Sequence, residues 1–265
     1  MMDSWVNLFD LALRIPISHL SLSPHTDFHG ACDLVFLSNP SFQDNLGMDV
    51  HIRTTLRDDF SFIESAALRI GTDVLEVSGW GEYIYNGVAS AEFPFTLGGY
   101  PVQFQQVDMK KYRFDIYYAE GQGIRIQTVK DLVNVQMVNA SMHEFEDSVG
   151  LLGHFGGNQL LSRDGNTDYF LTRDFDTFGL EWQVQPNEGM LFDDAREPQA
   201  PKQCIMPAPK SSETRHLRRL GEASVTQEAA EEACAQYHAE EHARKLCVSD
   251  VIALNDLEVA DAGAF

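Results

Sequence analysis

The chain has 265 residues, of which 44% are hydrophobic and 11% aromatic, and its formal net charge is −21 at pH 7. This length allows one large domain and an appendage, and the composition is that of a globular protein. The charge argues against nucleic acid and against an anionic membrane surface, since both are bound through lysine and arginine. It is compatible with divalent cations or basic partners, and no stretch approaches the length of a membrane span.

The N-terminal residues 1–23 predict a short amphipathic helix and a loop. They lack the positively charged start of a signal peptide, and Asp3 and Asp10 interrupt the apolar run. The sequence therefore contains no recognisable secretion signal.

From residue 28 onward, short alternating segments predict a long series of strands. In residues 48–55 the apolar side chains share one side, so His51 on the other side is expected to point to solvent. Asn86-Gly87 predicts a type I′ turn between two strands. Evenly spaced strands with such turns predict an antiparallel β-sandwich or barrel. The expected strands are 28–37, 48–55, 60–70, 73–78, 81–85, 101–107, 111–119, 124–129 and 132–139.

The C-terminal third changes in character. Residues 185–224 contain five prolines and predict an irregular linker, and residues 225–265 predict a helical tail. Ser224 or Thr226 is suited to cap the helix, and Arg244 and Lys245 lie near its expected end. Its apolar stripe is thin and comprises Ala230, Cys234, Tyr237 and Ala243.

The four cysteines are Cys32, Cys204, Cys234 and Cys247. Their number allows three fully paired connectivities, while four reduced thiols in a cytosolic protein remain the alternative. Asn139-Ala-Ser141 is an N-glycosylation sequon, which matters only if the protein is secreted.

A zinc-hydrolase hypothesis rests on His238-Ala-Glu-Glu-His242, which fits the His-x-x-Glu-His pattern. The two histidines would share one helical face, with Glu241 as the base. A third ligand should come from a glutamate well downstream, but Glu258 is the sole glutamate after His242. A helix rich in Glu and His also produces this pattern by chance.

A glycine-rich run extends from Gly150 to Asn158 and is followed by the acidic segment 164–168. Four glycines in nine residues indicate positive φ angles or a close backbone approach. Two interpretations are open: a surface turn, or a loop whose oxygen atoms bind calcium.

Together with residues 178–182 (Phe-Gly-Leu-Glu-Trp), this run resembles the closing half of a von Willebrand factor type D domain. That family usually has Gly-Leu-Cys-Gly-Asn-Phe-Asn-Gly, an acidic pair, and then a Gly-x-x-Trp strand. Residues 27–37 are similar to the opening strand of the family, and the sequence from Cys247 is similar to the tail after many such domains. The resemblance covers residues 24–184 and implies an all-β antiparallel sandwich with a helical, cysteine-containing appendage.

The sequence also departs from the family pattern. Leu152 replaces a cysteine, and His154 and Gly156 replace calcium ligands. The segment that normally precedes the opening strand is missing, so we expect the N-terminus to be truncated or incorrectly joined. The remaining candidate calcium ligands, which imply weak binding or none, are Asn158, Asp164, Asn166 and Asp168.

The resemblance also implies an oxidising compartment, the disulfides Cys32–Cys204 and Cys234–Cys247, and a buried Trp182 against residues 28–37. It implies no catalysis and no cofactor beyond weakly bound calcium. The expected function is that of an extracellular adhesion or matrix-assembly module that binds other extracellular proteins or itself, without nucleic acid or membrane insertion. The alternatives are the zinc hydrolase and an intracellular β-sandwich binding protein.

Overall fold

The computed structural model describes residues 28, 30–57, 60–141, 143–152, 159–169, 175–194, 204–207, 225–237, 244–245, 247–248, 251–252 and 255–261. Its strands are β1 (Asp33–Asn39), β2 (Met48–Arg57), β3 (Phe60–Ile70), β4 (Asp73–Ser78), β5 (Tyr83–Tyr85), β6 (Val88–Ala89), β7 (Thr96–Leu97), β8 (Tyr100–Asp108), β9 (Lys111–Ala119), β10 (Gln122–Val129), β11 (Leu132–Val138), β12 (Gln159–Leu161) and β13 (Thr167–Tyr169). Its helices are α1 (Phe42–Asn45), η1 (Gly79–Gly81), α2 (Phe175–Glu181), α4 (Gln227–Tyr237) and η2 (Leu257–Asp261).

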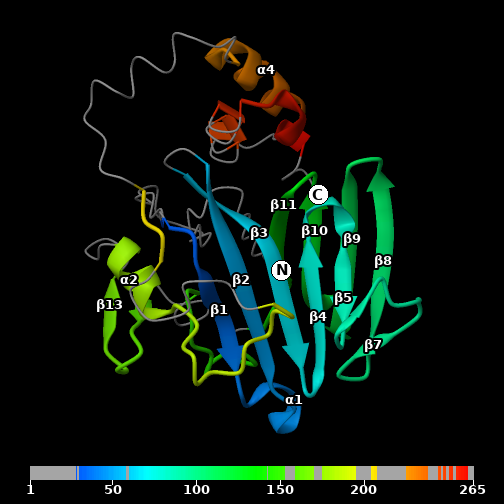
Figure 1. Cartoon of the computed structure of the whole chain (residues 1–265), viewed down its shortest axis with the longest axis vertical. Coiled ribbons are helices and arrows are strands. Elements are labelled where there is room, and N and C mark those ends of the chain that lie inside the picture. Colours follow the sequence, from blue (N-terminus) through cyan, green and yellow to red (C-terminus); the bar gives the residue numbers. More distant parts are fainter. Residues whose placement is uncertain are drawn as a thin grey trace. The chain divides into compact units, whose positions relative to one another are not determined.

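The chain divides into two compact units, Met1–Leu56 with Ser61–Ile205, and Arg57–Phe60 with Met206–Phe265. The first unit contains a six-stranded sheet in the order β1-β2-β3-β4-β5-β6 and a five-stranded sheet in the order β11-β10-β9-β8-β7 (Figure 1). All of the described strand pairs are antiparallel, as in a meander of hairpins. The all-β, sandwich-like fold with a small helical C-terminal part confirms the predicted fold class. The positive φ angles of Asn86 and Gly87, 47° and 77°, fit the predicted turn.

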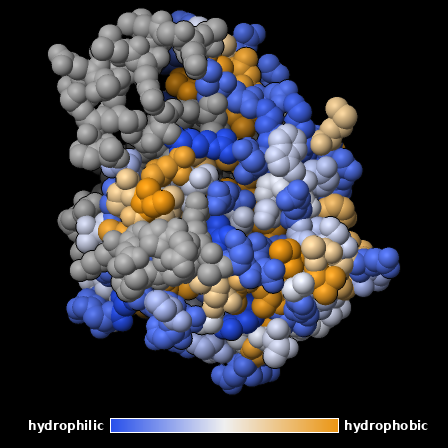
Figure 2. All heavy atoms as spheres, in the orientation of Figure 1, coloured by the Kyte–Doolittle hydropathy of each residue, from blue (hydrophilic) through white to orange (hydrophobic). Residues whose placement is uncertain are grey.

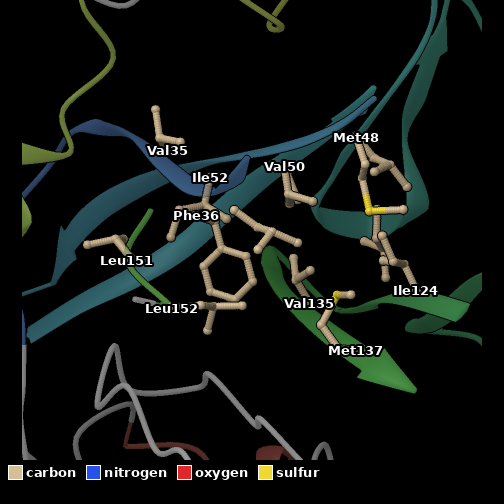
Figure 3. Close-up of a cluster of buried hydrophobic side chains, with 14 of the residues drawn as sticks. Val35, Phe36, Met48, Val50, Ile52, Ile124, Val135, Met137, Leu151 and Leu152 are labelled. Atoms are coloured by element: carbon tan, nitrogen blue, oxygen red, sulfur yellow. The ribbon is translucent and has the colours of Figure 1, made fainter. Parts of the chain in front are cut away.

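The two larger sheets bury apolar faces against each other. Figure 3 shows Phe36 and Ile52, from the six-stranded sheet, extending toward Val135 and Met137 of β11. These four side chains are at most 1% exposed. Leu152, at the position of the missing cysteine, is 2% exposed and belongs to the same cluster. An apolar side chain therefore packs where the resemblance would place a disulfide.

Strand β1 is the last strand of its sheet, and short segments of the same chain close its outer side. The backbones of Ser38 and Val149 exchange hydrogen bonds of 2.8 and 2.9 Å, and the N–H of Val35 donates to the carbonyl of Trp182 at 2.8 Å. Gly150 permits this close approach, because a Cβ there would lie 2.7 Å from a backbone oxygen of β1. Two further pairs that close this edge are Asp33–Val184 and Ala31–Ile205.

The outer face of the six-stranded sheet is also covered, so the prediction that His51 points to solvent is wrong. His51 is only 4% exposed. Leu191 and Phe192 pack against Ala67 on this face, and the backbone N–H of Asp193 donates to the Glu76 carboxylate at 2.9 Å. Alternation alone cannot reveal this cover, because it comes from a segment more than a hundred residues away.

A buried ion pair joins the covering segment to the sheet. The guanidinium of Arg53 donates to both carboxylate oxygens of Asp33, at 2.7 and 3.0 Å. It also donates to the side chain and the carbonyl of Asp194, both at 2.9 Å, and lies 4.4 Å from the ring centre of Phe192. The first part of the expected linker, up to residue 194, is therefore packed on the first unit.

The segment that contains Trp182 was expected to be a strand, which is wrong, because helix α2 occupies Phe175–Glu181. Gly179 lets this helix approach the core, since a Cβ there would lie 2.3 Å from the ring of Phe28. Trp182 itself is 4% exposed, as expected, and its indole N–H donates to the carbonyl of Leu161 at 3.1 Å. The guanidinium of Arg163 lies 4.8 Å from its ring centre.

Disulfides link Cys32 to Cys204 in the first unit and Cys234 to Cys247 in the second, which are the pairs that the resemblance implied. In the second unit the hydroxyl of Thr226 accepts the N–H of Ala229 at 3.2 Å and so caps α4. Among the residues of this unit that the structure describes, the buried ones are Ala230, Cys234, Cys247, Val251, Val259 and Ala260. Within α4 itself only Ala230 and Cys234 are buried, so this helix benefits from the disulfide.

Candidate interaction site

The most distinctive surface of the first unit is a group of aromatic side chains that we call the aromatic edge, comprising Tyr83, Tyr85, Phe93, Phe95, Phe104 and Tyr112. Strand β5 supplies the first two, residues 91–95 of the following loop the next two, and strands β8 and β9 one each. The group therefore lies where an end of the six-stranded sheet meets an end of the five-stranded sheet.

Hydrogen bonds from two tyrosines hold the loop in place. The hydroxyl of Tyr83 donates to the carbonyl of Ala91, and that of Tyr85 to the carbonyl of Thr96, both at 2.7 Å. The N–H of Val102 donates to the carbonyl of Phe95 at 3.1 Å and ties the other end of the loop to β8. The loop is thus fixed at both ends, which places its phenylalanines against the strands.

The rings form a continuous series of contacts from one sheet to the other. Tyr85 stacks on Phe95 with 4.2 Å between ring centres, and Phe95 stacks on Phe93 at 4.4 Å. Phe93 stacks on Phe104 at 5.2 Å, and Phe104 stacks on Tyr112 at 6.1 Å. The last two separations fall in the range of favourable aromatic pairs, each worth about 0.5–1.5 kcal/mol beyond area burial, and the first two are slightly shorter. Their geometry gives this surface a defined shape.

Part of the aromatic edge faces solvent, since Phe104 is 40% exposed. Two apolar residues outside this group are also exposed: Trp80 in η1, at 51%, and Met109 in the turn after β8, at 83%. In Figure 2, apolar residues reach the surface over the part of the sandwich where β5, β7 and β8 lie. Clustered exposed aromatic residues are characteristic of protein interaction surfaces.

Trp80 combines exposure with an unfavourable backbone conformation. Its φ of 62° lies in the left-handed region, which favours glycine. The flanking Gly79 and Gly81 pack tightly, because a Cβ would lie 2.3 Å from the backbone of Asp131 and 2.4 Å from the ring of Tyr112, respectively. The exposed indole gains little burial in return for this strained turn, so stability does not explain tryptophan here.

The charges near this site are unevenly distributed. From Tyr100 to Val107, β8 carries no charged residue, although the whole chain has a formal charge of −21. On the outer face of the same sheet, the Asp115 carboxylate lies between two guanidinium groups, 2.6 Å from that of Arg125 and 3.0 Å from that of Arg113. The carboxylate of Asp115, which is paired with Gln103 of β8 in the sheet, is thus already neutralised.

The predicted calcium loop is only partly described. Asn158 lies outside the described residues, and the side chain of Asp168, on β13, is not described. Asp164 and Asn166 come together in the β12–β13 turn, where the Asp164 carboxylate accepts the backbone N–H of Asn166 at 3.0 Å and its side-chain amide at 2.7 Å. Among the described residues, no three His, Cys, Asp or Glu side chains form a metal-binding group.

Two further predicted sites have different outcomes. His238, Glu241 and His242 lie outside the described residues, so the zinc motif stays a prediction. Asn139 is exposed at the end of β11, where its side-chain amide donates to the carbonyl of Gly121 at 3.0 Å. It is accessible to a glycan, and its modification also stays a prediction.

The aromatic edge was not found by the sequence reasoning, although a signal exists. Nine aromatic residues occur between Trp80 and Phe114, far more than the chain average. Alternation assigns a side chain to a strand face but cannot show that rings from four separate segments meet at a partly exposed edge.

A scan against protein-family models finds no match to this chain, and a search of curated proteins finds none either. In the described residues no helix is both long enough and apolar enough to cross a bilayer.

Proposed function

We propose that this chain is a non-enzymatic extracellular interaction module that binds a protein partner at the aromatic edge. The observation that carries the proposal is Trp80, a large apolar side chain that is half exposed on a strained turn, where the next residue, Gly81, packs against the ring of Tyr112 in the aromatic edge. Aromatic anchors of this kind dominate the energetics of protein interfaces. A rigid aromatic surface also loses little conformational entropy on binding.

Two other observations support the extracellular part of the proposal. All four cysteines are paired in two disulfides, and stable disulfides are characteristic of oxidising compartments. The resemblance to von Willebrand factor type D domains points to the same environment and to adhesion or matrix assembly.

Binding can be tested by immobilising the oxidised, full-length protein and exposing it to a fraction of secreted proteins. A second copy of this chain is one of the possible partners in that fraction. We expect Trp80→Gly to reduce capture of a specific protein at least about tenfold, because one buried aromatic anchor can contribute 2 kcal/mol or more. Ile205→Ala is the matched control, since Ile205 is 53% exposed but lies outside the aromatic edge. Equal capture by the Trp80 variant and the wild type would overturn the proposed binding site.

The extracellular assignment has its own test. Thiols counted under denaturing conditions, in protein recovered from its natural source, should number zero, because all four cysteines are paired. Four free thiols would contradict the proposal and favour an intracellular β-sandwich protein.

A further inference from the structure

Most of β8 has an open edge. Strand β7 pairs with β8 only at Tyr100 and Pro101, and the N–H of Val102 points away from β9 toward the carbonyl of Phe95. Backbone groups alternate in direction along an antiparallel strand. The N–H and C=O groups of residues 104 and 106 therefore also point away from β9, and within the described chain no strand pairs with them.

This open segment lacks the usual protection against pairing with other chains. Natural edge strands are blocked by charged side chains, prolines or bulges. Here Pro101 lies at the end of β8 that already pairs with β7, and the bulge follows Gln106 at the other end. The proline and the bulge therefore limit the length of the open segment but do not block it. Between them Gln103, Phe104 and Gln105 are exposed and uncharged. The segment can therefore accept another strand.

We propose that this segment pairs antiparallel with β8 of a second copy of the chain, around a twofold axis at Gln105. The inference rests on the proposed function and names the partner at the aromatic edge. The outward-facing residues Phe104 and Gln106 lie symmetrically on either side of Gln105. A twofold axis there places Phe104 opposite Gln106 of the second copy, so each copy donates and accepts two backbone hydrogen bonds.

The absence of charge on this segment favours a second copy over a basic peptide. Two molecules with a formal charge of −21 each repel one another, and an uncharged contact segment avoids adding to this repulsion. A basic strand would find no carboxylate between Tyr100 and Val107 to recognise. The glutamines at position 105 would face each other, and their amides are both donors and acceptors.

Burial of the aromatic edge adds to this pairing. In the proposed register the two Phe104 side chains are diagonal neighbours on the same sheet face, a separation that aromatic rings can bridge. Phe104 is 40% exposed in a single copy, so pairing would cover the ring that links Phe93 to Tyr112 in the stacked series.

The register predicts a specific cross-link in the full-length, oxidised protein. Gln105 of one copy faces Gln105 of the second copy in a non-hydrogen-bonded pair. Their Cα atoms would lie about 4.5 Å apart, a separation that a disulfide can bridge. Gln105→Cys should therefore form a covalent dimer on non-reducing gels. Gln103→Cys is the control, because residue 103 would face residue 107 of the second copy. We expect at least about tenfold less covalent dimer for the control.

Sedimentation of variants that keep all the native disulfides provides the second measurement. Gln105→Glu retains an acceptor for the Arg113 guanidinium, which donates to Gln105 at 2.6 Å, so folding should be preserved. It places two negative charges face to face and should weaken dimerisation at least about tenfold. Gln103→Glu adds the same charge away from the axis and should weaken it much less.

The outcomes separate this inference from the proposed function. A wild-type protein that remains monomeric at high concentration, or equal cross-linking by the two cysteine variants, would overturn β8 self-pairing. Trp80-dependent capture of a different protein would leave the proposed function standing in that case. Loss of the cross-link together with a persistent dimer would place the dimer interface elsewhere and overturn the inference.

Discussion

The outer edges of β1 and β8 differ in how far their backbone hydrogen-bonding groups are paired within the chain. At β1, residues from three distant segments form backbone hydrogen bonds with the strand, and Gly150 permits their approach. At β8, the described chain supplies only the two-residue strand β7 and one further hydrogen bond, from the N–H of Val102 to the carbonyl of Phe95. This difference between the two edges is the basis of the proposal that β8 pairs with a second copy.

The same contrast appears in the side chains. Next to β1 the polar groups are buried and paired. In the Arg53–Asp33 ion pair, the Arg53 side chain is 9% exposed and the Asp33 side chain 3%. Next to β8 the apolar group is partly exposed, with Phe104 at 40%. Mutations on the closed side should therefore reduce stability, whereas mutations on the open side should affect association.

The largest effect is expected at the closed edge. Trp182→Ala should reduce the free energy of unfolding by about 3–5 kcal/mol, because it leaves a cavity and removes the indole hydrogen bond to Leu161. Denaturant unfolding of the oxidised protein measures this change. A variant with an unchanged unfolding midpoint would show that Trp182 does not support the sandwich.

A slightly smaller loss is expected for the buried ion pair. Arg53→Met should cost about 3 kcal/mol, because the Asp33 carboxylate would stay buried without its partner. Arg69→Met is the control, since its side chain is 40% exposed where it contacts Asp49, and it should cost about 1 kcal/mol or less. Equal losses of stability in the two variants would show that the Arg53–Asp33 ion pair is not buried.

The pH dependence of stability tests whether His51 is buried on the outer face of the six-stranded sheet. Burial lowers the pKa of His51 to about 4 in the folded protein, whereas an unfolded histidine has a pKa of about 6.5. The unfolded state therefore takes up a proton that the folded state does not, and stability is lost as the pH falls from about 6.5 to about 4. We expect His51 to account for a loss of about 2–3 kcal/mol over this range.

The measurement compares urea unfolding at neutral pH and near pH 4.5 for wild type and His51→Gln. Removal of the histidine should make the decline with acid shallower, because its unfavourable protonation no longer contributes. His143→Gln provides the control, as its side chain is 95% exposed. If His51→Gln keeps the full wild-type decline, His51 is not buried in its neutral form.

The smallest effect on stability is expected on the open side. Trp80→Gly should change the free energy of unfolding by about 1 kcal/mol or less, because lost contacts are offset by relief of the left-handed conformation. Thermal and denaturant unfolding both measure it. A loss close to that of Trp182→Ala would mean that Trp80 is a core residue, and its proposed binding role would lose its main support.

Local patterns predicted the strands well, because alternation and turn residues act over a few positions. The strands 60–70, 73–78 and 111–119 were predicted with the bounds that the structure has. Burial of Trp182 followed from the resemblance, whereas helix α2 was missed, because a glycine inside a short helix is locally unfavourable and its close approach to Phe28 is a tertiary contact.

Long-range contacts explain the remaining errors. His51 looked solvent-facing because its cover, residues 188–194, comes from a segment that reads as a proline-containing linker. The aromatic edge escaped notice for the same reason, as its rings come from β5, the 91–95 loop, β8 and β9. Sequence periodicity assigns a side chain to a face but does not say what lies over that face.

Amide hydrogen exchange can distinguish a strand edge that a second copy covers from one that the chain itself closes. The amides of Phe104 and Gln106 should exchange quickly in dilute protein and slow down as the concentration rises through the dimer range, since only a second copy covers them. Those of Val35 and Ser38 should stay protected at every concentration, because the chain itself supplies their acceptors. Slow exchange at Phe104 and Gln106 in monomeric protein, or fast exchange in the dimer, would contradict this account.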